Sequence, residues 1–116
     1  MLIYKIFRPA EWDSLVTAGT TQGAPIDLSD GFIHFSTAEQ APGTAALHFA
    51  GAGDLVLAAV DTDRLGQDLK WEASRGGALF PHLFRELRMA DVAWHAPLPQ
   101  VGEAHVFPER FDGGAA

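Results

Sequence analysis

The chain has 116 residues, of which 47% are hydrophobic and 20% are charged, as in an ordinary globular domain. It has no cysteine, which excludes disulfides, thiolate catalysis and cysteine-bound zinc, and it has no apolar run of the ~18 residues that a membrane helix needs. Its formal net charge of −7 disfavours bulk nucleic acid. With no leader pattern at its start, we expect a cytoplasmic protein that forms one domain over residues 1–110, with a disordered tail at 111–116.

The basic residues are unevenly distributed along this acidic chain. Five of the eight lysines and arginines fall between positions 64 and 88: Arg64, Lys70, Arg75, Arg85 and Arg88. This concentration is compatible with a site for one small anionic molecule. The alternative is that most of these charges are solvated at the surface.

The first third of the chain predicts a strand, a helix and a loop. Residues 2–7 alternate as a strand does, and Pro9 follows at a position where helices begin. Hydrophobic residues at helical spacing continue this helix to Gly19. Residues 19–30 are rich in turn formers and predict a long loop, which is a frequent place for function in a small domain.

The middle of the chain predicts a second strand and a second helix. Residues 31–36 read as a strand. Two overlapping capping boxes, Ser36-x-x-Glu39 and Thr37-x-x-Gln40, predict that a helix starts directly afterwards. Pro42 breaks or restarts this helix, which then continues to about residue 50.

The second half of the chain predicts strands only. Residues 54–61 are apolar on both faces and predict a central, doubly covered strand. Residues 69–74 alternate as a half-buried strand, 80–84 form a stiff apolar segment, and 92–95 and 104–107 read as closing strands. Two helices among about six strands predict an α+β domain.

His34 and Ser36 are two residues apart on a predicted strand. This spacing puts both side chains on one face of the strand, away from Ile33 and Phe35. The strand therefore either lines a site or hydrogen-bonds a loop. Ser36 is better interpreted as a helix cap than as a hydrolase nucleophile, because the small residues of a G-x-S-x-G elbow are missing around it.

Glu72 is the second candidate for chemistry, and it lies beside Lys70 on the polar face of its strand. If this strand is a neighbour of the His34 strand, the two side chains can share a cleft, where they would move a proton or stabilise a developing positive charge. A surface ion pair is the alternative reading of Glu72. His82, in an apolar setting after Pro81, is either a ligand contact or a core histidine.

Four segments together resemble a known family: Gly31–Thr37, Asp54–Leu57, Leu69–Glu72 and Phe80–Phe84. The chain is similar, in this order and from about residue 2 to 108, to the bacterial domain-of-unknown-function family 952. That family is grouped by fold with the ADP-ribosyltransferases and tRNA 2′-phosphotransferases. The resemblance implies an ADP-ribosylation-like fold, in which two small sheets surround an NAD cleft.

The resemblance also implies roles for particular residues. Phe35-Ser36-Thr37 is similar to a Ser-Thr element of those enzymes, and Glu72 stands for the glutamate that binds the nicotinamide ribose. We expect His34 and Glu72 to be catalytic and Ser36, Thr37, Lys70 and His82 to bind NAD, which is a substrate or ligand and not a fixed cofactor.

Three functions follow from these residues. The first is an NAD- or nucleotide-dependent transferase or glycohydrolase, and the second is a small-ligand-binding module that has lost turnover. The third, a metal hydrolase that uses His34, Glu72 and His82, is disfavoured because their spacing matches no metal motif. No dinucleotide fingerprint or P-loop is present, so a Rossmann or P-loop route to nucleotide binding is excluded.

Overall fold

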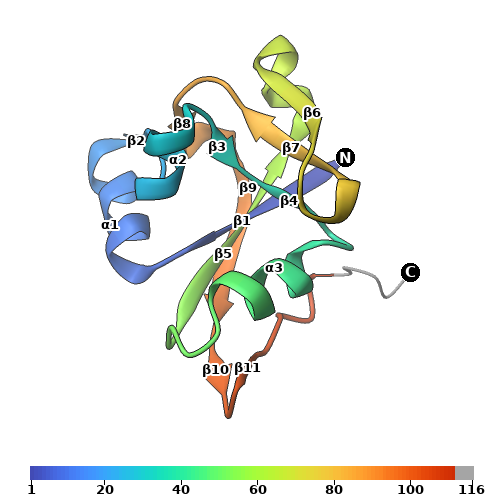
Figure 1. Cartoon of the computed structure of the whole chain (residues 1–116). Coiled ribbons are helices and arrows are strands. Elements are labelled where there is room, and N and C mark those ends of the chain that lie inside the picture. The colour runs from blue at the N-terminus through green and yellow to red at the C-terminus, as the bar shows by residue number, and fades with distance from the viewer. Residues whose placement is uncertain (112–116) are drawn as a thin grey trace.

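The computed structural model describes residues 1–111, in which helices pack against several small antiparallel sheets in an α+β arrangement (Figure 1). Three α-helices lie in this range: α1 (Pro9–Ala18), α2 (Pro25–Asp30) and α3 (Ala41–His48). The strands are β1 (Leu2–Phe7), β2 (Thr20–Thr21), β3 (Ile33–His34), β4 (Ser36–Thr37), β5 (Leu55–Asp61), β6 (Leu69–Ala73), β7 (Leu79–Leu83), β8 (Leu87–Arg88), β9 (Val92–Leu98), β10 (Gln100–Val101) and β11 (Ala104–His105). Short 3-10 segments occupy Thr62–Arg64, Gly66–Asp68, Arg75–Gly77 and Met89–Asp91. None of the helices described within 1–111 is long and apolar enough to span a membrane.

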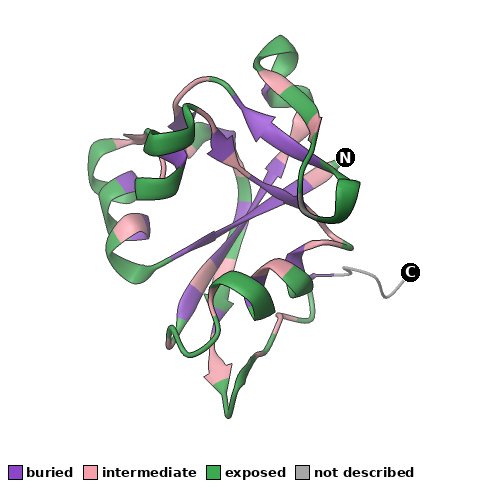
Figure 2. Cartoon of the chain, viewed as in Figure 1, coloured by how far each residue is buried: buried purple, intermediate pink, exposed green. Residues whose placement is uncertain are grey.

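Two sheets organise the domain. The larger has the strand order β4-β1-β5-β9, the smaller has the order β3-β7-β6, and two-stranded pairs β2-β8 and β10-β11 complete the set. β1 and β5 lie at the centre and are largely buried (Figure 2). The strands predicted at 2–7, 54–61 and 69–74 are confirmed as β1, β5 and β6, and so is the α+β class.

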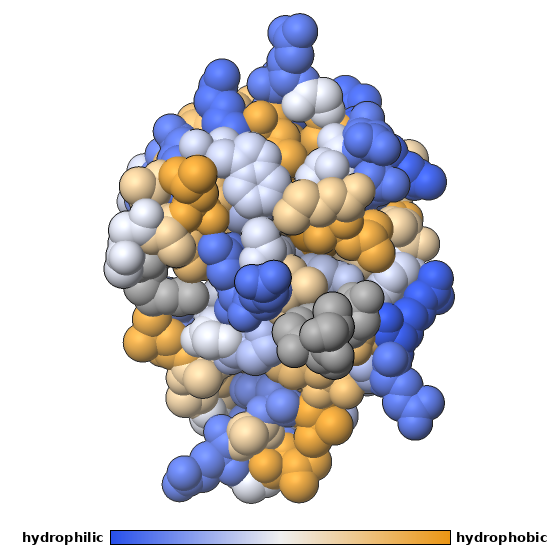
Figure 3. Space-filling view, turned by 90° about the vertical axis from the view of Figure 1, so that its right-hand side faces the viewer, coloured by the Kyte–Doolittle hydropathy of each residue, from blue (hydrophilic) through white to orange (hydrophobic). Residues whose placement is uncertain are grey.

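The core lies on both faces of the larger sheet. Ile3 and Phe7 of β1 face a cluster that includes α1, whereas Tyr4 and Ile6 face a cluster that includes α3. Phe111 belongs to this second cluster, and its ring meets that of Tyr4 edge-on at 4.8 Å between centroids. Phe111 is the first residue of the predicted tail, and the others, 112–116, lie outside the described residues. On the face shown in Figure 3, hydrophobic side chains gather in small patches between hydrophilic ones, as on most protein surfaces.

The prediction of a loop over 19–30 is wrong, because this segment contains β2 and α2. Pro25 begins α2, where its fixed φ suits the first helical turn. The carboxylate of Asp27 accepts a hydrogen bond of 2.7 Å from the backbone N–H of Ala24, which is otherwise unsatisfied at the helix start. Gly31, at φ 85°, ends the helix in the left-handed conformation.

The predicted start of the second helix is also wrong. α3 begins at Ala41 with Pro42 inside its first turn, so the proline initiates this helix and does not break it. Thr37 and Gln40 do exchange the two hydrogen bonds of a capping box, at 3.0 and 3.2 Å, but these bonds close a turn before the helix. Ser36 lies in β4 and is not a helix cap.

The strand predicted at 31–36 is split between the two sheets. β3 pairs with β7 of the smaller sheet, β4 pairs with β1 of the larger sheet, and the backbone N–H of Phe35 between them donates to the carbonyl of Pro81 at 3.0 Å. β4 covers β1 only at Ile3 and Tyr4. From Lys5 onward this edge of β1 is left without a neighbouring strand among the described residues.

Candidate functional site

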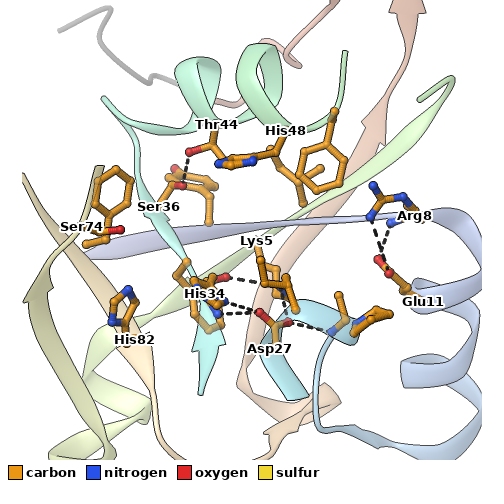
Figure 4. Close-up of a pocket in the computed structure, with 18 residues that line it drawn as sticks. Lys5, Arg8, Glu11, Asp27, His34, Ser36, Thr44, His48, Ser74 and His82 are labelled. Carbon is orange, nitrogen blue, oxygen red and sulfur yellow. Dashed lines mark hydrogen bonds and ion pairs between the residues drawn. The ribbon is translucent and has the colours of Figure 1, made fainter. Parts of the chain in front are cut away.

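A cavity of about 540 Å³ lies along the uncovered edge of β1 (Figure 4). Its lining comes from β1, α1, α2, β3, β4, α3 and β7, together with the segments around them. Three of the predicted site residues line it: His34, Ser36 and His82. Figure 4 shows Lys5, Asp27 and His34 close together, with His82 on one side of them and Arg8 on the other.

The carboxylate of Asp27 connects three segments at the centre of this site, through contacts with Ala24, His34 and Lys5. Its Oδ1 atom accepts from both the backbone N–H of His34 at 3.1 Å and the ring Nδ1 of His34 at 2.6 Å. Its Oδ2 atom accepts from the backbone N–H of Ala24 at 2.7 Å and lies 3.0 Å from Nζ of Lys5. All four acceptor positions of the carboxylate are therefore used, and its side chain is fully buried.

The charge of Asp27 is stabilised by these partners. Burial alone raises the pKa of the Asp27 carboxyl, but the hydrogen bonds from His34 and the ammonium of Lys5 outweigh burial and lower that pKa to about 2. Lys5 is almost completely buried and donates a second hydrogen bond to the carbonyl of His34 at 3.3 Å. Nζ of Lys5 also lies 5.6 Å from the centre of the Phe7 ring, and the side chain lines the cavity.

His34 is held so that one ring nitrogen is anchored and the other faces outward. Its Nδ1 meets the buried Asp27, whereas its Nε2 lies 3.0 Å from Oδ2 of Asp30, an exposed carboxylate at the end of α2. A carboxylate at Nδ1 fixes the orientation of an imidazole and supports proton transfer at its other nitrogen. His34 therefore has a carboxylate at each ring nitrogen, a buried one at Nδ1 and an exposed one at Nε2.

His82 lies beside His34 on the smaller sheet. The two residues are direct cross-strand partners, and their ring centroids are 5.4 Å apart. Nδ1 of His82 is 2.8 Å from Oε1 of Glu72, and the ring of Phe32 stacks on His82 at 4.1 Å and lies against His34 at 4.6 Å. The aromatic ring of Phe32 thus restricts the orientation of both imidazoles.

The register of β3, β7 and β6 puts four of the predicted residues, His34, Lys70, Glu72 and His82, on one sheet face without bringing all of them to the cavity. His82 pairs with His34 on one side and with Lys70 on the other, and Glu72 follows Lys70 by two residues. Glu72 therefore shares a face with His34, but His82 lies between them, and the pair does not meet directly. Glu72, Lys70 and Thr37 are not among the residues that line the cavity.

Ser36 contributes a hydroxyl to the cavity, where its Oγ lies 2.8 Å from Oγ1 of Thr44 on α3. Ser74 and His48 add further polar groups, and Tyr4, Phe35, Phe49 and Phe80 add aromatic surface. Within residues 1–111 no three His, Asp or Glu side chains converge as metal ligands. The donor set suits an organic ligand with polar and aromatic parts.

Sequence reasoning missed Asp27, Lys5 and Arg8 as parts of the site. For Asp27 a signal was present: a proline at the first helical position, an acidic residue two positions later and a glycine after the last turn indicate a short helix. For Lys5 no local signal exists, because its partner comes from a segment more than 20 residues away.

The protein is thus a small α+β domain, and one wall of its cavity carries a histidine, His34, whose Nδ1 is held by the buried carboxylate of Asp27. The family model of proteins of unknown function (DUF952) matches residues 6–95, and the chain belongs to this family. The crystal structure of protein CC0527 from Caulobacter crescentus is similar at 51% identity and a TM-score of 0.86, over 90% of this chain and 92% of that chain. The solution NMR structure of CC0527 is similar at 52% identity and a TM-score of 0.80, over 90% of each chain. No curated protein matches this chain.

Proposed function

We propose that the cavity binds a nucleotide-like anion, with NAD as the first candidate, and that His34 acts as the acid or base in cleaving or transferring its ribosyl group. The observation that carries this proposal is the anchoring of His34 Nδ1 by a fully buried carboxylate at a cavity wall. The ADP-ribosylation-like fold is part of the proposal. Its support is the resemblance of the sequence and the presence of a cavity beside two small antiparallel sheets.

The size and lining of the cavity support a ligand of this class. Ligand pockets usually measure about 300–1,000 Å³, and this cavity is about 540 Å³. Aromatic rings suit a flat heterocycle, and Lys5, Arg8 and His48 suit phosphate oxygens. Of the fourteen acidic residues within 1–111, only Glu11 and Asp27 line the cavity, although the chain has a net charge of −7.

In the proposed reaction the glycosidic bond between ribose C1′ and nicotinamide breaks, and the bonding electrons leave with the nicotinamide. The oxygen of water or of an acceptor group then bonds to C1′, and His34 takes the proton that this oxygen loses. Glu72 does not line the cavity, so it would stabilise the cationic ribose only after its carboxylate turns from His82 toward the cavity.

A second function, a binding module without turnover, is favoured by one observation. All three carboxylates next to the two histidines are engaged: Asp27 with four donors, Asp30 with Nε2 of His34 and Glu72 with His82. A site that stabilises a cationic transition state needs a carboxylate that faces the ligand. In this alternative, His34 and Lys5 contact a ligand that leaves unchanged.

The test is a titration with NAD and with ADP-ribose, followed by NMR, together with an assay for released nicotinamide. We expect resonances of Lys5, His34 and Ser36 to shift, and we expect His34→Gln to abolish nicotinamide release. His95→Gln is the matched control, because His95 is exposed on β9 and does not line the cavity.

The outcomes separate the two functions. Binding without nicotinamide release supports the binding module and rejects the enzyme. No binding at millimolar NAD or ADP-ribose rejects both. Release that is unchanged in Glu72→Gln rejects the role given to Glu72.

A further inference from the structure

The two carboxylates that contact His34 differ in how firmly they are held. Asp27 is fully buried and accepts at both of its oxygens from several donors. The Asp30 side chain is 42% exposed, and its Oδ2 atom lies 3.0 Å from Nε2 of His34. Asp27 is therefore a fixed anchor, whereas Asp30 is held mainly by an exposed ion pair, which is a weak interaction.

Asp30 also lies at a point of the chain that permits movement. It is the last residue of α2, and Gly31 follows it in the left-handed conformation at φ 85°. α2 has only six residues, and its other end is fixed to the site through Asp27. A change in the side-chain torsions of Asp30 is enough to expose Nε2, because the backbone of α2 stays anchored.

A ligand can contact Nε2 of His34 only after Asp30 leaves this atom. An anionic oxygen of a ligand has the charge and the acceptor character of the Asp30 carboxylate, so it fits the same position. The two anions repel each other and cannot occupy that position together. Lys5, on the Asp27 side of His34, lines the same cavity.

We propose that Asp30 is an internal competitor of the ligand, which occupies Nε2 of His34 until an anionic ligand oxygen, of a phosphate or a carboxylate, displaces it. The proposal rests on the proposed function in its binding-module form, because a ligand anion on Nε2 of His34 occupies the nitrogen that would otherwise take a proton. Asp30 does not itself line the cavity and acts on the site through its contact with His34. It assigns Asp30 as a specificity-determining residue. It also identifies the ligand class: a molecule that presents an anionic oxygen to His34.

The experiment measures the affinities of adenosine and AMP, with inorganic phosphate and acetate as minimal anions. Asp30→Asn keeps the size of the side chain and removes its charge, so we expect it to bind AMP about three- to tenfold more tightly than the wild type does. The affinity for adenosine should stay unchanged. Phosphate or acetate should compete with AMP, and the better competitor identifies the preferred anion.

Asp13→Asn is the matched control, because it makes the same change of net charge at an exposed position of α1. Neither aspartate lines the cavity, but Asp30 contacts His34. Equal AMP affinity in Asp30→Asn, Asp13→Asn and the wild type overturns the role of Asp30 and leaves the proposed function standing. An equal gain for adenosine and AMP overturns the anion requirement, because Asp30 would then act only as a steric cover. If neither the wild type nor Asp30→Asn binds AMP or adenosine at millimolar concentration, the role of Asp30 and the proposed function are both overturned.

Discussion

The Asp27–His34 pair and the Glu72–His82 pair have the same chemistry and opposite exposure. In each pair a carboxylate oxygen lies close to an imidazole Nδ1, at 2.6 and 2.8 Å. In the first pair the carboxylate is 0% exposed and the imidazole 34%, whereas in the second pair the carboxylate is 44% exposed and the imidazole 6%.

The buried member of each pair is the one that the fold fixes. Asp27 is held by donors from α2, β1 and β3, so His34 is the member presented to a ligand. His82 is held by the sheet and by stacking on Phe32, so Glu72 is the member free to exchange partners. Asp27 and His82 are therefore the members on which the stability of the fold depends. Variants of the two carboxylates, Asp27 and Glu72, should differ in how much they lower the free energy of unfolding.

The largest effect is expected for Asp27→Asn. The change leaves the ammonium of Lys5 buried without a carboxylate, and breaking a buried ion pair in this way costs about 3–5 kcal/mol. Urea unfolding followed by tryptophan fluorescence measures the loss. A loss below about 1 kcal/mol would show that the first pair is no more structural than a surface ion pair.

Gly23→Ala should disturb the same anchor through the backbone. Gly23 has a φ of 101°, and a Cβ atom there would lie 2.3 Å from Oδ2 of Asp27. Gly31→Ala is the matched control, since Gly31 also has a positive φ, 85°, but a Cβ atom there meets nothing within 4 Å.

Both variants place an alanine in a left-handed conformation, which lowers the free energy of unfolding by about 1–2 kcal/mol. We expect Gly23→Ala to lower it by about 1–3 kcal/mol more, because of the clash with Asp27. Its His34 resonances should also move, as a shift of Asp27 requires. Equal losses in the two variants would mean that Asp27 moves aside freely.

Acid should weaken the first pair. The pKa of Asp27 is 3.8 in its ordinary state and about 2 in the folded protein, so the folded state favours the ionised form. The stabilisation is present above about pH 4, and it is lost as the pH falls toward 2, because protonation becomes complete in the folded protein too. The shift corresponds to about 2 kcal/mol.

The measurement is the free energy of unfolding between pH 5 and pH 2, in the wild type and in Asp27→Asn. The decrease on acidification should be smaller in the variant by about this amount. Parallel curves for the two proteins would show that Asp27 is not the group responsible.

The smallest effect is expected for Glu72→Gln. Its carboxylate is half-exposed and its amide replacement still accepts from His82, so the loss in the free energy of unfolding should stay below about 1 kcal/mol. The same urea experiment as for Asp27→Asn measures it. A loss as large as that of Asp27→Asn would remove the contrast between the two pairs.

The sequence was sufficient for the long, strongly patterned elements. The alternation of residues 2–7 and the apolar run at 54–61 predicted the two central strands, because burial on a sheet imposes a period on the sequence. The candidates His34, Ser36 and His82 were found for a related reason. Their polar side chains interrupt apolar strand segments, and the structure places all three at the cavity.

The remaining part of the site depends on contacts between distant segments. Whether β3 and β4 continue as one strand is decided by β7 and β1, which lie far away in the sequence. Asp27 reaches Lys5 across 22 positions, so neither residue reveals the other by local spacing. Pro42 permitted two readings, and only the packing of α3 decided between a broken helix and a helix start.

The division of one segment at Phe35 also has an evolutionary consequence. Residues before Phe35 belong to one sheet and carry the histidine, whereas residues after it belong to the other sheet and carry the hydroxyl. Substitutions on one side can therefore accumulate without altering the pairing register of the other. Within the family, the wall of the cavity that carries the hydroxyl can change while the wall that carries the histidine stays the same, and the reverse also holds.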